Sequence, residues 1–215
     1  MLYKITALDI QKGNPNRTSV FLDGRYAFGL ATSRASRLKV GQTIAPEERA
    51  MLEQQDLVDV TEARALRYLG YRPRSQAEIR SHLQRHGSDE QVINQVLTRL
   101  AEAGLADDEA FARFWVHNRE TFRPRGQRSL RYELRGKGVS DELIGEALQA
   151  TDDRAAAYRV AAKWAVSRSG LDYPTFLRRL GGLLQRRGFD YGIIASTVKR
   201  VWQESTSAPE QEMGS

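Results

Sequence analysis

Apolar residues along most of this chain recur with the period of an α-helix, and the pattern itself returns after a fixed interval. The stretch RPRSQAEIRSHLQRHG at 72–87 is followed by RPRGQRSLRYELRGKG at 123–138, a shift of 51 residues. In each copy two apolar residues four positions apart precede a glycine: Ile79, Leu83 and Gly87, then Leu130, Leu134 and Gly138, and in a fainter third copy Leu180, Leu184 and Gly188. A fixed period that keeps apolar residues and a glycine in register is typical of repeated supersecondary units.

The ends of the expected helices carry residues that favour helix termini. Ser75 followed by Glu78 is a capping box, which predicts a helix from about Gln76. Gly87 is a natural left-handed terminator, and Ser88 is expected to cap the next helix. Further caps are expected at Asp107 or Asp108, at Ser140, at Thr151 or Asp152, and at Asp190.

The repeated unit is therefore helix, turn, helix, turn, helix, and the chain is predicted to be mainly α. We expect a linking helix at 46–62. Three tandem three-helix repeats in an extended curved array should follow it, at 63–108, 109–151 and 152–204. In the third repeat, Gly181 and Gly182 stand inside a predicted helix, where each glycine costs about 1 kcal/mol relative to alanine. Residues 205–215 lack apolar periodicity, and we expect them to form a disordered tail.

The first 45 residues are expected to form a small antiparallel β unit. Strand formers at 3–10 and 17–22 are followed by Asp23-Gly24, a dipeptide that favours a hairpin, and 25–29 would be the returning strand. This predicts three strands, with 38–44 as a loop into a helix. A three-stranded sheet is marginal alone, so it should dock on the helix from about Glu47 to Leu57. The helical pattern runs on to Leu69 and leaves open a break between Val58 and Thr61.

Composition narrows the classes of protein. There is no 18-residue apolar run and no signal-like N-terminus, so a soluble cytoplasmic protein without membrane contact is expected. Cysteine is absent, which excludes disulfides, cysteine-ligated zinc and thiol catalysis. The net charge of +6 and a pI near 9.7 favour an anionic partner.

The basic excess lies in the C-terminal half of the chain. Residues 1–110 carry 15 basic and 15 acidic side chains, whereas 111–215 carry 18 and 12. The densest segment sets two acidic residues, Glu120 and Glu133, against seven basic ones: Arg119, Arg123, Arg125, Arg128, Arg131, Arg135 and Lys137. With Arg72, Arg74, Arg178, Arg179, Arg186 and Arg187 these are the candidate partner-binding residues.

Two interpretations of these arginines stay open. A solvated helix face is the plainer one, but an imbalance of seven to two exceeds what pairing along a helix can neutralise. Arg128, Arg131 and Arg135 recur at i, i+3 and i+7, which predicts one stripe on a helix. Such a stripe can follow phosphates or meet an acidic protein surface.

Other chemical candidates have ordinary structural explanations. Asp107 and Asp108 precede an amphipathic helix, where capping explains paired carboxylates. His82 and His86 have the spacing of two metal ligands on a helix but lack a third ligand. Aromatic residues at helical spacing are expected in the core, namely Phe111, Phe114, Trp115, Trp164 and Trp202. No phosphate-binding loop, dinucleotide fingerprint or nucleophile elbow occurs, so we expect no catalysis, cofactor or metal.

Several motifs together resemble one family. They are the RPRS-x-x-E-I-x3-L-x3-G pattern, the segment GLADDEAFARF at 104–114, and RG-x4-R-x-E-L-x2-KG-V at 125–139. These residues are similar to the RecX family of regulators of the bacterial recombinase RecA, and the hairpin VFLDGRYAF at 20–28 resembles an extension that some members carry. The resemblance implies a curved helical modulator that lies in the groove of the RecA–DNA filament. It further implies inhibition of ATP hydrolysis and strand exchange without chemistry of its own.

Three functions remain in competition at this stage. The first is a regulator, expected to be a monomer, that binds the RecA filament and contacts single- or double-stranded DNA weakly and in a salt-dependent way. The second is a helical protein that binds DNA directly, since three-helix units resemble helix-turn-helix folds. The third is a scaffold for an unrelated protein. Basic residues alone do not separate the first two.

Overall fold

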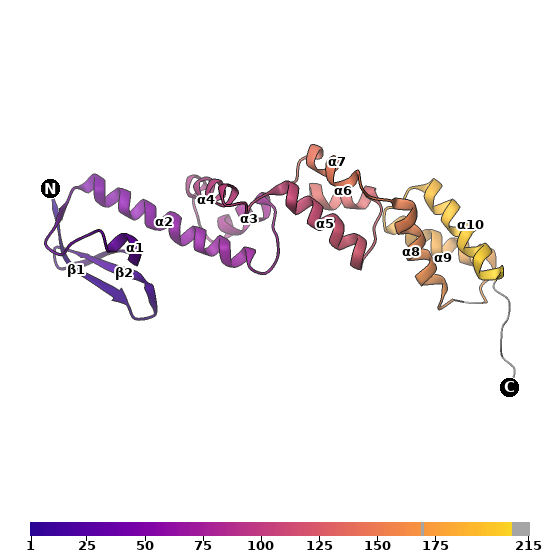
Figure 1. Cartoon of the computed structure of the whole chain (residues 1–215), viewed down its shortest axis with the longest axis horizontal. Helices are drawn as coiled ribbons and strands as arrows, with labels where there is room; N and C mark the ends of the chain where they lie inside the picture. Colours follow the sequence, from indigo (N-terminus) through magenta and orange to yellow (C-terminus); the bar gives the residue numbers. More distant parts are fainter. Residues whose placement is uncertain (169, 208–215) are drawn as a thin grey trace, which may run out of the picture. The chain divides into compact units, whose positions relative to one another are not determined.

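The computed structural model describes residues 1–168 and 170–207, and Figure 1 labels its helices and the strands β1 and β2. By their internal contacts these residues divide into two compact units. The first unit comprises Met1–Arg72 and Ile79–Ala106. The second comprises Pro73–Glu78 and the residues from Asp107 onward. Helix α3 (Gln76–Arg85) therefore begins in the second unit and ends in the first.

The N-terminal sheet has four antiparallel strands in the order β3-β2-β1-β4. Their bounds are β1 Tyr3–Gln11, β2 Asn14–Leu22, β3 Arg25–Ala31 and β4 Thr43–Ile44. The hairpin turn is confirmed, because Asp23 and Gly24 both have positive φ, 51° and 79°. The expectation of three strands was wrong. β4, predicted as loop, is too short to show an alternating pattern, yet Ile44 is fully buried.

Helix α2 (Pro46–Leu69) joins this sheet to the first helical bundle. Its first half covers the sheet, where Leu52 packs on the β core, as predicted. Arg17 and Arg34 bind Asp56 and Asp59 of α2, each at 2.8 Å, and so fix the sheet and the short helix α1 (Thr32–Ala35) to it. The helix is continuous through Val58 to Thr61, and both of these residues are buried. The predicted linking helix and the first helix of the first repeat are thus one helix.

The first bundle consists of α2, α3 from Ile79 onward and α4 (Glu90–Glu102). Ile79 and Leu83 of α3, predicted as its apolar face, are completely buried. Arg99 of α4 binds Asp59 and Glu62 of α2 at 3.0 and 2.8 Å. The carboxylate of Asp59 therefore holds Arg34 as well as Arg99, and it connects the β unit to the bundle.

The second and third bundles repeat this arrangement. α5 (Asp108–Phe122), α6 (Gln127–Arg135) and α7 (Asp141–Leu148) enclose one core, and α8 (Asp153–Ala165), α9 (Tyr173–Arg186) and α10 (Tyr191–Ser207) enclose another. Phe111 lies in the second core, so the helix after Gly104 opens the second bundle. Three tandem three-helix units are therefore confirmed. α10 reaches Ser207, so 205–207, expected in the tail, are helical, and 208–215 lie outside the described residues.

Most of the helix termini predicted from the sequence are confirmed. The Ser75–Glu78 capping box is formed: the backbone N–H of Glu78 donates to Ser75 Oγ at 3.1 Å, and the backbone N–H of Ser75 donates to Glu78 Oε2 at 3.3 Å. Asp107, Ser140 and Asp152 accept backbone N–H groups at the starts of α5, α7 and α8. Ser88 was the wrong choice, since Asp89 is the N-cap residue of α4 and makes no side-chain cap bond. The glycines that end the helices have positive φ, as expected for Gly87, Gly104, Gly138 and Gly188.

A close backbone contact joins the second and third bundles within the second unit. The N–H of Gly126 donates to the carbonyl of Arg187 at 2.9 Å, and Asp153 accepts the N–H of Gln127 at 3.1 and 3.0 Å through its two oxygens. A side chain on Gly188 would clash, because its Cβ would lie 2.8 Å from the backbone nitrogen of Ser129. This contact holds the first turn of α6 against the end of α9.

The first turn of α3 makes the equivalent contact one repeat earlier. Asp108 accepts the N–H of Gln76 at 2.8 Å, and the hydroxyl of Ser75 donates to the carbonyl of Lys137 at 2.6 Å. A Cβ on Gly138 would collide with the side chain of Ala77. The 51-residue period seen in the sequence thus repeats a contact as well as a fold.

Two glycines of the third bundle should respond in opposite ways to alanine. Gly181 lies inside α9, and an added Cβ would meet Ile194 at an ordinary 3.8 Å, so Gly181→Ala should raise the free energy of unfolding. The expected gain is about 0.5–1 kcal/mol. Gly188→Ala, at φ 82° and against Ser129, should lower it. Urea unfolding monitored by circular dichroism measures both, and a destabilised Gly181→Ala would contradict this packing.

Candidate binding surface

The outward face of α6 presents the predicted arginine stripe. Leu130 and Leu134 are buried in the second core, which turns Arg128, Arg131 and Arg135 away from it. Tyr132 stands among them with 81% of its side chain exposed. We call Arg128, Arg131, Tyr132 and Arg135 the α6 face. They line a hollow of about 410 Å³ with Gln127 and Asp190.

The charges of the α6 face are only weakly compensated. Arg135 binds Asp141 at 2.6 Å, and this hydrogen bond lowers the pKa of Asp141. Both side chains are more than half exposed, so the pair contributes little to stability and can be exchanged for another anion. Among residues 1–168 and 170–207, neither Arg128 nor Arg131 forms an ion pair with a carboxylate. The stripe is thus available to a partner.

Several other basic residues of the segment from Arg119 to Lys137 form ion pairs inside the second unit. The carboxylate of Glu133 accepts from Trp115 Nε1 at 2.8 Å and from Arg119 Nε at 2.7 Å. It also lies 3.0 Å from Arg125 Nε, and only 17% of its side chain is exposed. One glutamate therefore balances two arginines that the sequence made candidates for binding.

Lys137 is also held internally. Its Nζ lies 2.9 Å from Glu78 Oε1 and 4.2 Å from the centre of the Trp115 ring. The guanidinium of Arg119 is 4.4 Å from the same ring. Trp115 thus contacts two cations as well as the second core, which explains why this amphipathic ring is only partly buried. Arg119, Arg125 and Lys137 therefore have partners inside the chain, and their role in binding a partner protein or DNA stays a prediction.

The other candidate residues are dispersed. Arg72 and Arg74 are half-buried, and both interact with other residues of the chain. Arg123 is exposed. Arg178, Arg179 and Arg186 are exposed on α9 and line a different hollow from that of the α6 face. Arg187 is half-buried, and burial together with the charges of Arg125 and Arg123 lowers its pKa.

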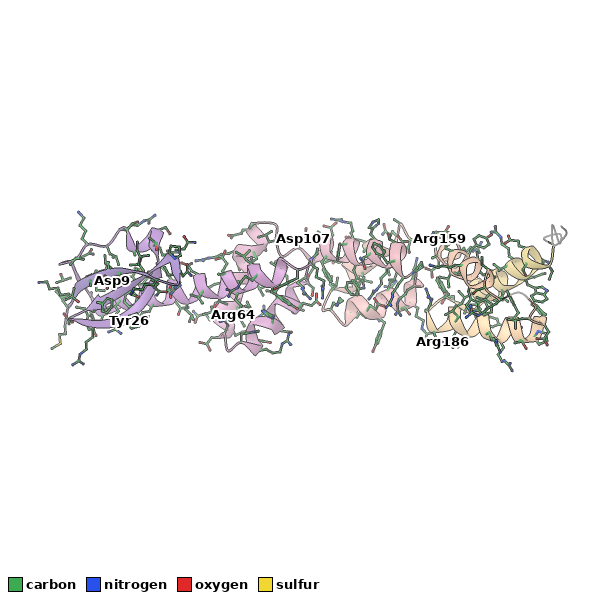
Figure 2. All side chains as sticks on the ribbon, turned by 90° about the horizontal axis from the view of Figure 1, so that it is seen from below. Asp9, Tyr26, Arg64, Asp107, Arg159 and Arg186 are labelled. Atoms are coloured by element: carbon green, nitrogen blue, oxygen red, sulfur yellow. The ribbon has the colours of Figure 1, made fainter. Side chains whose placement is uncertain are left out.

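The alternative chemistries considered from sequence have structural explanations. Asp107 caps α5 (Figure 2). The ring of His82 stacks on Tyr68 at 4.0 Å, and His86 Nδ1 lies 2.8 Å from the carbonyl oxygen of His82. Nowhere in the described ranges do three or more metal-ligating side chains gather. No helix in the same ranges is long and apolar enough to cross a membrane.

Sequence reasoning missed Tyr132. Its signal was present, since it is an aromatic residue between Leu130 and Leu134 that cannot share their buried face. An exposed ring among arginines is the pattern of surfaces that bind nucleic acid. Phe111, Trp164 and Trp202, by contrast, contact the cores as predicted.

Comparison with known proteins agrees with this architecture. Residues 3–45 match the model "Regulatory protein RecX N-terminal domain", and 63–100 and 107–148 match the first and second three-helix domains of RecX. The Regulatory protein RecX of Bacillus subtilis (strain 168) is 30% identical over 213 residues, which cover 97% of this chain and 81% of that protein. The chain belongs to the RecX family.

One further RecX protein and two crystal structures are also similar to this chain. The Regulatory protein RecX of Prosthecochloris aestuarii is 40% identical over 138 residues, or 64% of this chain and 91% of that protein. A crystal structure of regulatory protein RecX aligns with a TM-score of 0.72 and 25% identity over 92% of this chain and 99% of the other. RecX from Lactobacillus salivarius shares the fold, with a TM-score of 0.62 and 23% identity, over 69% of this chain and 99% of the other. The three matched domains end at residue 148, before the third bundle.

Replacing Glu133 tests whether the neighbouring arginines are structural. Glu133→Gln keeps the size of the side chain but removes the charge that Arg119 and Arg125 share. It should lower the free energy of unfolding by about 1–3 kcal/mol and shift the fluorescence of Trp115. Glu146→Gln, an exposed substitution on α7, should change stability by less than about 0.5 kcal/mol. Equal effects of the two substitutions would mean that the Glu133 network does not contribute to the free energy of unfolding.

Proposed function

We propose that this protein regulates homologous recombination by binding the RecA–DNA filament and lowering its ATP hydrolysis and strand exchange. Membership of a family whose members are named regulatory proteins supports a regulatory role. The observation that carries the proposal is the α6 face, where a cationic stripe points to solvent. The protein acts as a ligand: it shifts the filament between states only by its differential affinity for them.

The geometry of the second bundle suits this role. Leu130 and Leu134 anchor α6 in the core, and Gly126 fixes the start of the helix to the third bundle. The stripe is therefore presented on a helix that is held at its start and along its buried side, so little conformational freedom is lost when it binds. Arginine forms paired hydrogen bonds with carboxylates and phosphates alike, which suits a filament made of protein and DNA.

Direct action on DNA is the second candidate, and one observation favours it. Tyr132 exposes its ring between Arg128, Arg131 and Arg135, and an aromatic ring among cations can stack on an unpaired base. In that case the affinity for bare single-stranded DNA would equal that for the filament.

Charge reversal on the α6 face separates these functions. Arg128→Glu with Arg131→Glu should weaken binding to a RecA filament assembled on single-stranded DNA by at least about tenfold, or about 1.4 kcal/mol. Arg25→Glu with Arg37→Glu changes net charge equally at exposed positions of the β unit and should leave binding unchanged. Fluorescence anisotropy of labelled protein measures both, against filament and against the same DNA alone.

The salt dependence of binding decides between protein and phosphate as the main contact. If the α6 face acts on DNA, the charge reversal weakens binding to bare DNA as much as binding to the filament. The slope of log affinity against log salt then flattens by about 1.4, because two phosphate contacts at about 0.7 each are lost. If it acts on the filament, binding to bare DNA is weak throughout. Retention of full filament affinity by the reversed variant would remove the α6 face from the interface.

A further inference from the structure

The third bundle carries a second basic surface with different chemistry. One hollow of about 460 Å³ is bounded by Phe122, Val160, Trp164 and Leu183 among others. A neighbouring hollow of about 430 Å³ is also lined by Trp164 and Leu183. Because the two hollows share these residues, they adjoin each other along α8 and α9 and are described together as one groove, which the end of α5 also bounds. We call it the α8–α9 groove.

Cations line both sides of the groove. Arg159, Lys163 and Arg168 come from α8 and the residues after it, whereas Arg178, Arg179, Arg186 and Arg187 come from α9 and its end. Figure 2 labels Arg159 and Arg186, one from each side. Of the described residues that line the two hollows, Glu120 alone is acidic. In the part of the chain that the structure describes, none of the seven cations forms an ion pair with a carboxylate.

Two of these cations donate hydrogen bonds to neutral acceptors. Arg187 donates to the carbonyl of Pro124 at 3.2 Å, and Arg168 donates to Ser167 Oγ at 2.9 Å. Burial, and then the charges of Arg125 and Arg123, lower the pKa of Arg187, because each disfavours its cationic form. A carboxylate in the groove would compensate the charge of Arg187 through paired hydrogen bonds.

The floor of the groove is apolar and already packed. Arg168 lies over the Trp164 ring at 4.9 Å, and Phe176 meets that ring at 5.4 Å with an interplanar angle of 73°. The Trp164 ring therefore forms part of this floor, and little of its face is free to stack on a base. Val160, Leu183 and the 74% exposed Phe122 supply further apolar surface. A hollow of this volume and lining accepts a large apolar side chain.

We propose that the α8–α9 groove binds an acidic peptide segment of a partner protein. Carboxylates of the segment would pair with the arginines of both helices, and one large apolar side chain would enter between Trp164 and Leu183. Arginine clusters that read acidic motifs and grooves that take an apolar anchor are both established modes of peptide recognition. This site goes beyond the proposed function, since it needs neither DNA nor the α6 face.

Peptide selection on the full chain tests the proposal. A phage library of random 12-residue peptides is selected on the wild-type protein after depletion on Lys163→Glu with Arg179→Glu, which reverses one exposed cation on each side of the groove. The enriched peptides should combine several Asp or Glu residues with one large apolar residue. Synthetic copies should bind the groove variant at least about tenfold more weakly, or about 1.4 kcal/mol.

Controls separate the groove from general charge attraction. Arg154→Glu with Lys199→Glu makes the same charge change at exposed positions of the same bundle outside the groove, and it should leave peptide affinity unchanged. Replacing the apolar anchor of the peptide by serine should cost at least about tenfold, without any question of protein folding. A 20-residue oligothymidylate should bind the wild-type protein more weakly than the selected peptides.

Three results would overturn the proposal. Enriched peptides that bind both double variants equally would show that the groove is not the site. An anchor that serine replaces without loss would leave only charge attraction. Oligothymidylate that binds more tightly than any selected peptide, and loses affinity in the groove variant, would identify a nucleic-acid site instead.

Discussion

The carboxylate of Asp153 accepts the backbone N–H of Gln127 at the start of α6, and the way the second bundle meets the third depends on this contact. The first N–H groups of a helix have no partner within it, so a helix that starts against another element must receive acceptors from that element. The approach is close enough that Gly126 and Gly188 have no room for a side chain. Because Asp108 and Gly138 repeat the arrangement at the first turn of α3, the constant spacing of the repeats is also the spacing of these contacts.

Fixing α6 in this way divides the basic charge into two kinds. Glu133, on the side of α6 near Trp115, takes Arg119 and Arg125 into a network that stabilises the second bundle. The opposite side carries Arg128 and Arg131, which form no ion pair with a carboxylate among the described residues. A dense run of positive charge in a sequence is therefore a mixture of structural and available cations. What a partner can recognise is the available part: the α6 face, and in the third bundle the α8–α9 groove.

Sequence alone predicted the features that depend on local pattern. The Ser75–Glu78 capping box, the Asp23-Gly24 hairpin and the glycines that end helices follow from short-range chemistry, and the repeat period gave the three bundles. It failed where distant residues decide. β4 is two residues long and is defined by its pairing with Tyr3 and Lys4. That Arg119 and Arg125 share Glu133 depends on how α5 approaches α6, and the α8–α9 groove depends on which side of α8 faces α9. Neither can be seen in spacing along one helix.

The most direct test of the central claim is ATP hydrolysis by the host recombinase, assembled on single-stranded DNA, as this protein is added. A parallel titration of the same DNA without recombinase gives the concentration at which bare DNA becomes coated. We expect hydrolysis to fall at concentrations well below that point, and Arg128→Glu with Arg131→Glu to shift the inhibition to higher concentration. Hydrolysis that is unaffected, or that falls only when bare DNA is saturated, would contradict a filament-directed regulator.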